Sequence, residues 1–372
     1  MGARTRRRRI AAGVVCGLAL AAFAFGAKLG DGTGRPEPSV ASRLPLGQLA
    51  GQRLVAGFQG TEVTVALRRM IRSGGLAGVI LFAENLPSRS AGRRLVRRLQ
   101  AIPRPPGLRD PLLVMVDQEG GLVKRVGGAP SASAEEMGAR GTAFSRRQGR
   151  ATAANLRGVG IDVDLAPVLD VARPGGTISI THRGFGSTPA QVAATGVAFA
   201  EGLKDGGVVA TAKHFPGLGA ARQNTDFAVE RIGLSKATLR RVDEAPFRRF
   251  VEAGGEIVML GTAIYPALSP KPAAFARPIA TGELRARLGF RGVSVTDAME
   301  AVAVRDFGGA AKAGTAAARA GTDLLLFADY RAAARAARAL RQGLRSAALS
   351  RDAFEASVDR VLRLRHGLAT PD

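Results

Sequence analysis

Eight short apolar segments recur along the chain, and they constrain its fold more than any other feature. Each is rich in Val, Leu and Ile with few alternating polar positions, which is typical of strands buried on both faces of a sheet. They are residues 53–58, 77–82, 112–116, 163–168, 208–212, 257–261, 293–296 and 324–327. Arg-rich amphipathic stretches between them predict helices over residues 61–72, 90–101, 134–156, 189–204, 236–253 and 309–320, with a helical end over residues 330–367.

This alternation of strands and helices predicts an α/β fold. Eight strand–helix units match a TIM (β/α)8 barrel, which typically takes about 250 residues and tolerates insertions. An open, doubly wound sheet is the alternative architecture for the same alternation. We see no sign of a second domain, so residues 46–372 are expected to form one barrel.

The N-terminal segment has the pattern of an export signal. Residues 6–9 are consecutive arginines, and residues 10–27 carry no charge until Lys28. The apolar run is long for a signal peptide core and short for a membrane span, so residues 1–29 are expected to be a signal peptide or a membrane anchor. Residues 30–45 contain three prolines and are expected to be a linker. The protein should therefore be exported, and either secreted or attached to the cell envelope.

The charge raises nucleic-acid binding as a hypothesis. The chain has 54 Lys+Arg against 30 Asp+Glu, a formal net charge of +24. The arginines are spread over several predicted helices, and with no Trp and two Tyr there are few side chains on which bases could stack. We expect no nucleic-acid partner, and a basic outer surface that could hold the protein near anionic wall polymers. One Cys and three His predict no disulfide framework and no metal centre, and no cofactor is implied.

Polar residues follow the predicted strands. In a TIM barrel the carboxyl ends of the strands form the active-site face. The residues found there are Glu84, Asn85, Asp117, Glu119, Asp164, Asp170, Lys213, His214, Tyr265, Asp297 and Asp329. Carboxylates and cations would thus converge on one opening, which favours a hydroxyl-rich substrate. The chain has no G-x-S-x-G, phosphate-binding P-loop or H-E-x-x-H motif.

Five motifs resemble those of glycoside hydrolase family 3, and they occur in that family's order. They are Val116-Asp117-Gln118-Glu119-Gly120-Gly121 followed by Arg125, Ala166-Pro167-Val168-Leu169-Asp170, Arg183-Gly184-Phe185-Gly186, Ala212-Lys213-His214-Phe215-Pro216-Gly217, and Val295-Thr296-Asp297-Ala298. A chain without the family's C-terminal sandwich domain is similar to its single-domain bacterial β-N-acetylhexosaminidases, which act on peptidoglycan fragments. The resemblance implies a retaining, exo-acting hydrolase of terminal β-linked N-acetylglucosamine in peptidoglycan-derived or chitin-like oligosaccharides. We expect the protein to be a monomer.

The resemblance also implies residue roles. Asp297 would be the nucleophile that forms a covalent glycosyl-enzyme intermediate. The remaining candidates would bind the sugar. Asp117 would accept hydrogen bonds from hydroxyls. The cationic candidates would donate hydrogen bonds to hydroxyls or to the N-acetyl group, and they are Arg125, Arg183, Lys213 and His214. From the residues alone, Asp297 could equally cap a helix that begins at Ala298, and the arginines could be structural.

The proton donor departs from the family pattern. The hexosaminidase branch carries Asp-Ser-His about ten residues after the Lys-His pair, whereas this chain has Asn224-Thr225-Asp226. Asp226 could replace the histidine as acid/base, because burial or a neighbouring carboxylate can raise the pKa of a carboxylic acid. The chain could instead be an impaired relative that binds sugar, or a variant with altered chemistry such as phosphorolysis or β-glucosidase activity. Asn-Thr-Asp also fits a simple turn. Asp226 as acid/base is the working hypothesis.

Overall fold

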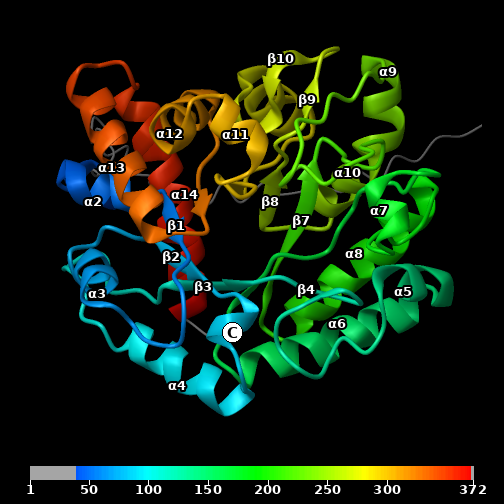
Figure 1. Ribbon diagram of the computed structural model, residues 1–372, viewed down its shortest axis with the longest axis horizontal. Helices are drawn as coiled ribbons and strands as arrows, with labels where there is room; N and C mark the ends of the chain where they lie inside the picture. The colour runs from blue at the N-terminus through cyan, green and yellow to red at the C-terminus, as the bar shows by residue number, and fades with distance from the viewer. Residues whose placement is uncertain (1–38, 370–372) are drawn as a thin grey trace, which may run out of the picture. The chain divides into compact units, whose positions relative to one another are not determined.

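The computed structural model describes residues 39–369 of the chain (Figure 1). The predicted signal or anchor segment, residues 1–29, lies outside the described residues. Residues 39–45, which the sequence analysis placed in the linker, include the short helix α1 (Val40–Arg43). Ala41 in α1 is fully buried, and its main-chain nitrogen donates to Asp359 Oδ1 at 3.4 Å. The folded unit therefore begins at Ser39.

The predicted barrel is confirmed. Its eight parallel strands are β1 (Leu54–Ala56), β2 (Gly78–Ile80), β3 (Leu113–Val116), β6 (Val163–Asp164), β7 (Val209–Phe215), β8 (Ile257–Leu260), β11 (Val293–Thr296) and β12 (Leu325–Phe327). They pair in the order β11-β8-β7-β6-β3-β2-β1-β12. A parallel bridge between Val295 and Leu324 joins the two ends, and Thr296 N donates to Leu324 O at 3.0 Å. The sheet is thus closed, and the open doubly wound alternative is wrong.

Side chains alternate between the inside and the outside of the barrel, as the pleat of a strand requires. In β3, Leu113 and Met115 belong to the interior cluster, whereas Val114 and Val116 pack against the outer helices. The last helix, α14 (Arg351–Ala369), contributes Val361 to the interior cluster and contacts β11. It therefore packs against the interior of the barrel, and the carboxyl ends of the strands remain free to build a site.

Several of the outer helices begin at a residue whose side chain caps them. The outer helices are α2 (Leu46–Gly51), α3 (Val65–Arg72), α4 (Arg89–Gln100), α5 (Ala134–Arg140), α6 (Thr142–Arg157), α8 (Pro189–Asp205), α10 (Ala245–Glu252), α12 (Gly309–Ala320) and α13 (Tyr330–Arg345). Thr64, Ser88 and Thr188 cap α3, α4 and α8 with their side-chain oxygens.

Two helix predictions need correction. The single helix expected over residues 134–156 is divided into α5 and α6 at Gly141, whose φ of +83° does not fit a right-handed helix. The stretch 236–253 is α9 (Lys236–Thr238), a π-helical segment η2 (Leu239–Asp243) and then α10. Sequence analysis also missed the π-helical segment η4 (Pro278–Arg287).

Shorter elements complete the connections. They are the 3-10 turns η1 (Ala83–Asn85) and η3 (Ala273–Phe275), the helices α7 (Thr177–Ile180) and α11 (Val302–Asp306), and two hairpins, β4 (Gln118–Gly120) with β5 (Val123–Lys124) and β9 (Ile264–Tyr265) with β10 (Ser269–Pro272). The hairpin β4–β5 directly follows β3, and α11 follows β11 after a short loop. Both therefore lie at the carboxyl face of the barrel, where they surround the site described next.

Candidate active site

One cavity of about 500 Å³ opens at the carboxyl ends of the barrel strands. All the site residues predicted from the sequence line it: Asp117, Arg125, Arg183, Lys213, His214, Asp226 and Asp297. The first and the last of these residues are more than 170 positions apart in the chain, so the closed barrel is what brings them together. The floor is apolar, with Leu165 and Met259 among its lining residues.

The deepest part of the cavity holds a buried network of four charges. Lys213 Nζ lies 2.6 Å from Asp117 Oδ1 and 2.8 Å from Glu119 Oε1. Arg183 donates to Glu119 through Nε and a terminal nitrogen, both at 2.7 Å. The side chains of Lys213 and Glu119 are 3% and 2% exposed, whereas those of Asp117 and Arg183 are 18% exposed. Asp117 and Arg183 are thus the members of the network that a ligand can reach most easily.

The network keeps Glu119 and Lys213 ionised. Burial alone would raise the pKa of Glu119, but the positive charges of Lys213 and Arg183 outweigh it and hold that pKa well below its usual value. Burial would lower the pKa of Lys213, but Asp117 and Glu119 raise it above its usual value. Lys213 is therefore a permanent ammonium group, suited to hydrogen bonding with hydroxyls rather than to proton transfer.

Lys213 and His214 lie within β7, not after a strand as the sequence suggested, because β7 pairs with β8 as far as Phe215. His214 is held by Asp170, whose Oδ2 lies 2.8 Å from the imidazole Nδ1 and whose Oδ1 accepts from His214 N at 3.1 Å. The same Oδ1 accepts from Leu218 N at 2.6 Å. Because Asp170 occupies Nδ1, the imidazole Nε2 is the ring atom available to a ligand.

Gln118 fixes the loop that carries Arg125. Its side-chain nitrogen donates to Val126 O at 2.7 Å and to Ala129 O at 2.8 Å, and its side-chain oxygen accepts from the main-chain nitrogens of Arg125 and Val126 at 2.9 Å. Gln118 N in turn donates to Asp164 Oδ1 at 3.0 Å beneath the cavity. Arg125 thus reaches the cavity from a well-fixed main chain.

Asp297 follows the last residue of β11. Its main-chain nitrogen donates to Leu260 O at 2.9 Å, which continues the ladder with β8, and its Oδ1 accepts from Ala298 N at 2.8 Å. No helix begins at Ala298, since α11 starts only at Val302. The helix-cap interpretation of Asp297 is therefore wrong, and its carboxylate lines the cavity.

Asp226 lies in a turn at the rim of the same cavity. Asn224 Oδ1 accepts from Asp226 N at 2.9 Å, and Asn224 O accepts from the main-chain nitrogens of Phe227 and Ala228. Asp226 O accepts from Val302 N at 3.2 Å, which joins this turn to the start of α11. The expected turn is thus present, and it presents Asp226 to the cavity.

Two effects raise the pKa of the Asp226 carboxyl group. The larger is partial removal from water at the cavity rim, and the second is the negative charge of Asp297. His214 and a hydrogen bond with Asn224 act in the opposite direction but are weaker. The interaction with Asp297 indicates that the two carboxyl groups face the same space, and a raised pKa is what a proton donor needs.

Several strand-end residues have structural roles instead. Asn85 is fully buried and donates to Phe58 O at 2.9 Å and Gly60 O at 2.6 Å. The Tyr265 hydroxyl donates to Gly217 O at 2.9 Å. Asp329 caps α13.

Sequence reasoning missed Glu300, whose carboxylate lines the cavity and accepts from Ala328 N at 2.9 Å. No local sequence pattern marks this residue, because its place at the cavity depends on the turn that follows β11. Among residues 39–369, no group of three or more His, Cys, Asp or Glu side chains is arranged to hold a metal ion. Within the same residues, every helix is too short or too polar to cross a membrane.

Comparison with known proteins agrees with the family resemblance of the sequence motifs. The family model described as the glycosyl hydrolase family 3 N-terminal domain matches residues 45–364. An uncharacterized secreted glycosyl hydrolase of Arthroderma benhamiae is 38% identical over 297 residues, which cover 78% of this chain and 83% of that protein. A beta-hexosaminidase of Stenotrophomonas maltophilia is 34% identical over 285 residues, covering 73% and 82%.

Solved structures agree. A glycoside hydrolase family 3 beta-N-acetylglucosaminidase from Paenibacillus sp. FPU-7 has a TM-score of 0.83 at 32% identity, with 88% of this chain and 64% of that chain covered. A beta-N-acetylhexosaminidase from Beutenbergia cavernae has a TM-score of 0.80 at 31% identity, with 87% and 99% covered. This chain thus spans a little under two thirds of the Paenibacillus protein and nearly all of the Beutenbergia one. The family match and these relatives, together with the carboxylates that line the cavity of the barrel, identify a glycosidase. The chain belongs to glycoside hydrolase family 3.

Proposed function

We propose that this chain is a retaining, exo-acting β-N-acetylhexosaminidase that removes terminal β-linked N-acetylglucosamine from peptidoglycan-derived or chitin-like oligosaccharides. The observation that carries the proposal is the cavity in which Asp297, Asp226 and the buried Lys213 network meet. The beta-hexosaminidase and beta-N-acetylglucosaminidase relatives support the choice of sugar.

In the first step, the carboxylate of Asp297 bonds to the anomeric carbon while the glycosidic C–O bond breaks. The carboxyl group of Asp226 gives its proton to the departing oxygen, so the aglycone leaves as an alcohol. The raised pKa of Asp226 keeps part of it protonated where an ordinary aspartate is ionised. The product is a covalent glycosyl-Asp297 intermediate.

In the second step, the roles reverse. Ionised Asp226 takes a proton from a water molecule, and the oxygen of that water displaces Asp297 from the anomeric carbon. Two displacements at the same carbon retain the β configuration. Asp226 is regenerated as an acid and Asp297 as a carboxylate, so no further reactant is required.

The other cavity residues hold the sugar. Asp117 accepts hydrogen bonds from hydroxyls, and Lys213 and Nε2 of His214 face the same space. Arg125 and Arg183 donate to hydroxyls or to the N-acetyl oxygen. Because the Lys213 network is already paired within the protein, it is ordered before the sugar binds, which lowers the cost of organising the site.

A second candidate is a sugar-binding protein with impaired catalysis. The position of Asp226 favours it, since the side chain is exposed at the rim and the only histidine in the cavity, His214, is held by Asp170. Such a protein would keep the sugar contacts but lack an efficient proton donor.

Turnover of aryl β-glycosides of N-acetylglucosamine and glucose, with and without phosphate, tests the proposal. We expect hydrolysis of the N-acetylglucosaminide with no phosphate dependence. Sugar binding without turnover would identify the impaired binder. Preference for glucose would indicate a β-glucosidase, and a sugar phosphate product would indicate a phosphorylase.

We further propose export of the protein, with residues 1–29 as signal peptide or anchor and the following residues as a linker. The uncharged run after four arginines supports this, as does the name of the secreted Arthroderma relative. Cell fractionation of the tagged full chain tests it, and cytoplasmic recovery would contradict it.

A further inference from the structure

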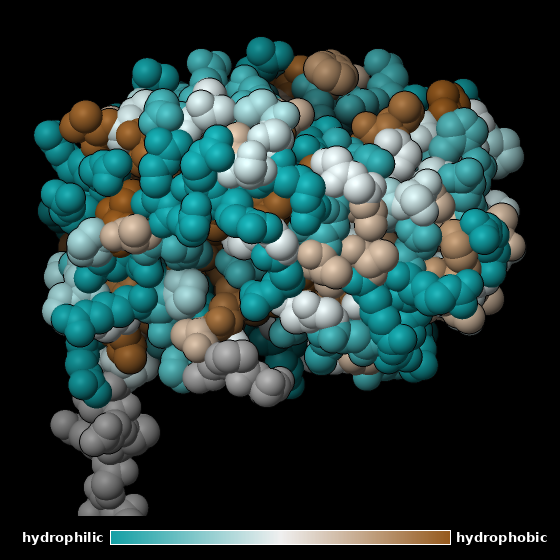
Figure 2. All heavy atoms as spheres, turned by 90° about the horizontal axis from the view of Figure 1, so that it is seen from below, coloured by the Kyte–Doolittle hydropathy of each residue, from teal (hydrophilic) through white to brown (hydrophobic). Residues whose placement is uncertain are grey.

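The outer face of α4 carries an unusual concentration of positive charge. This helix has five arginines in twelve residues and no acidic side chain. Its buried positions are Gly92, Leu95, Val96 and Leu99, so the arginines point away from the barrel. Figure 2 views the molecule from the side of α4 in Figure 1, and this face is mostly hydrophilic.

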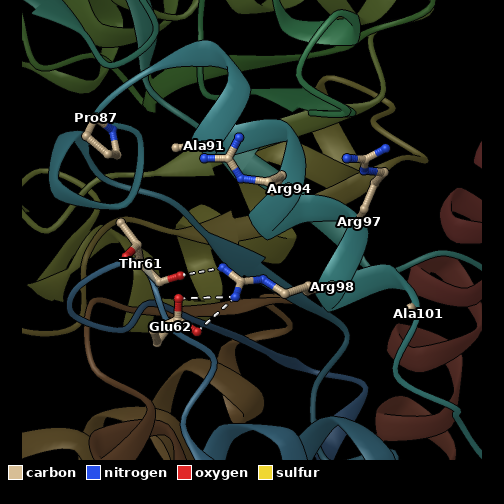
Figure 3. Close-up of a pocket in the computed structure, with 8 residues that line it drawn as sticks. All are labelled: Thr61, Glu62, Pro87, Ala91, Arg94, Arg97, Arg98 and Ala101. Carbon is tan, nitrogen blue, oxygen red and sulfur yellow. Dashed lines mark hydrogen bonds and ion pairs between the residues drawn. The ribbon is translucent and has the colours of Figure 1, made fainter.

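Two grooves flank α4. The first, of about 580 Å³, lies between α4 and the loop that precedes α3, and its charged lining residues are Glu62, Arg94, Arg97 and Arg98 (Figure 3). The second, of about 590 Å³, lies on the other side of the helix, and its charged lining residues are Arg93, Arg97, Arg104, Arg157 and Asp162. Arg97 lines both grooves, so they form one continuous surface, here called the α4 surface.

The α4 surface has positive charge that the protein does not neutralise. Arg98 is paired with Glu62 at 2.9 Å and donates to Thr61 O at 3.0 Å. Arg157 lies 3.5 Å from Asp162. The side chains of Arg94 and Arg97 make no hydrogen bond or ion pair with any residue in the described part of the chain, and Figure 3 shows no dashed contact from either guanidinium group. Two exposed guanidinium groups one helical turn apart are thus available to a ligand.

The chemistry of these groups indicates a repeated anion. A guanidinium group binds phosphate through two parallel hydrogen bonds, and arginines three residues apart on a helix are neighbours. The linings of both grooves contain no Phe, Tyr or Trp, so there is no platform on which nucleobases could stack. An extended polymer with regularly spaced phosphates and no bases is complementary to such a surface.

We propose that the α4 surface binds a linear polyanion of phosphodiester-linked polyol or sugar units. Pro87 lines the first groove, and Phe82, five residues earlier in the same loop, lines the catalytic cavity. A polymer held there would keep the catalytic opening close to the glycans that accompany it. The binding site is distinct from the catalytic cavity, and it does not depend on the sugar specificity proposed above.

Binding of fluorescent poly(glycerol phosphate) to the full chain, measured over a series of salt concentrations, tests this proposal. Arg94→Gln/Arg97→Gln should weaken binding about tenfold at low salt and reduce the slope of log K against log salt by about 1.4, since about 0.7 is lost for each phosphate contact. Arg335→Gln/Arg338→Gln is the matched control. Both arginines are exposed on α13, so these substitutions remove the same two positive charges at another place on the surface. It should change Kd less than about twofold.

The outcomes are distinct. Equal weakening by both double variants would show attraction to net charge alone and would overturn the proposal, as would an absence of binding. Tighter binding of an oligothymidylate with the same number of phosphates would instead indicate a nucleic-acid site, and binding only to phosphatidylglycerol vesicles a membrane site. Both contradict it. Thermal unfolding and aryl glycoside turnover should be unchanged in both variants. The binding measurement does not depend on turnover, so an absence of hydrolase activity would not affect its outcome.

Discussion

Lys213 Nζ lies 2.8 Å from Glu119 Oε1, and both side chains are almost entirely buried. Two buried opposite charges stabilise each other only while both are present, because each alone would lack compensation for its lost hydration. Arg183 depends on Glu119 as well, through two hydrogen bonds. Glu119 is therefore the residue that holds this charged end of the cavity together.

Glu119→Gln should destabilise the protein by roughly 3–5 kcal/mol, since it leaves the ammonium group of Lys213 and the guanidinium group of Arg183 without their common counter-ion. Urea unfolding measures this. The control is Asp117→Asn, whose side chain is more exposed; it should cost less stability and act mainly by raising KM. Equal stability losses would contradict the distinction.

Asp297→Asn should reduce kcat by at least about a thousandfold, because an amide cannot form the glycosyl-enzyme bond. The main-chain bond to Leu260 O is retained, so thermal stability should be nearly unchanged. A chromogenic β-N-acetylglucosaminide reports the rate. Wild-type activity in this variant would remove Asp297 from the nucleophile role.

Asp226→Ala should lose far more activity on substrates with poor leaving groups than on activated aryl glycosides, because only the former need a proton. The raised pKa of Asp226 also fixes the direction of the pH dependence. Because the acid must be protonated, kcat/KM of the wild type should fall as pH rises through that pKa, which lies above the usual value for aspartate. The alanine variant should lack this alkaline limb. An equal loss on both kinds of substrate would exclude Asp226 as the acid.

Asn224→Asp/Asp226→His should move the alkaline limb of kcat/KM toward neutral pH, since an imidazole titrates at about pH 6.5. The turn that presents residue 226 is held largely by main-chain groups and by an oxygen that aspartate also supplies at position 224. Asp226→His alone is the comparison. An unchanged pH profile in both variants would argue against residue 226 as the proton donor.

Buried Asp162 should make the stability of the protein depend on pH. Burial raises the pKa of its carboxyl group to about 6, against the weaker effect of Arg157. The folded state therefore holds its proton to higher pH than the unfolded state, and stability falls as pH rises from about 4 to about 6. In the wild type, this effect should lower the free energy of unfolding by an amount on the order of 2 to 3 kcal/mol between pH 4 and pH 7, and Asp162→Asn should abolish that decrease. Urea unfolding at both pH values measures it. The exposed Glu84→Gln is the control and should leave the difference unchanged.

The strand pattern predicts the barrel well because buried parallel strands leave a strong apolar signal. Helix interruptions are harder to predict, since the break at Gly141 depends on one backbone angle. At the site, the motif residues do meet in one cavity, but their partners are set by packing. Glu300 lines the cavity only because the chain turns back after β11, where Met299 N donates to Leu326 O at 3.0 Å. No local pattern encodes such a turn.

The bond from Val302 N to Asp226 O has a kinetic consequence. It joins the loop after β7 to the loop after β11, so the segments that carry the two catalytic candidates are mechanically coupled. A fluctuation that withdraws the proton donor would have to break this bond or displace the start of α11. A single main-chain hydrogen bond contributes only about 1 kcal/mol, so it favours joint movement of the two loops over independent movement without holding the rim closed.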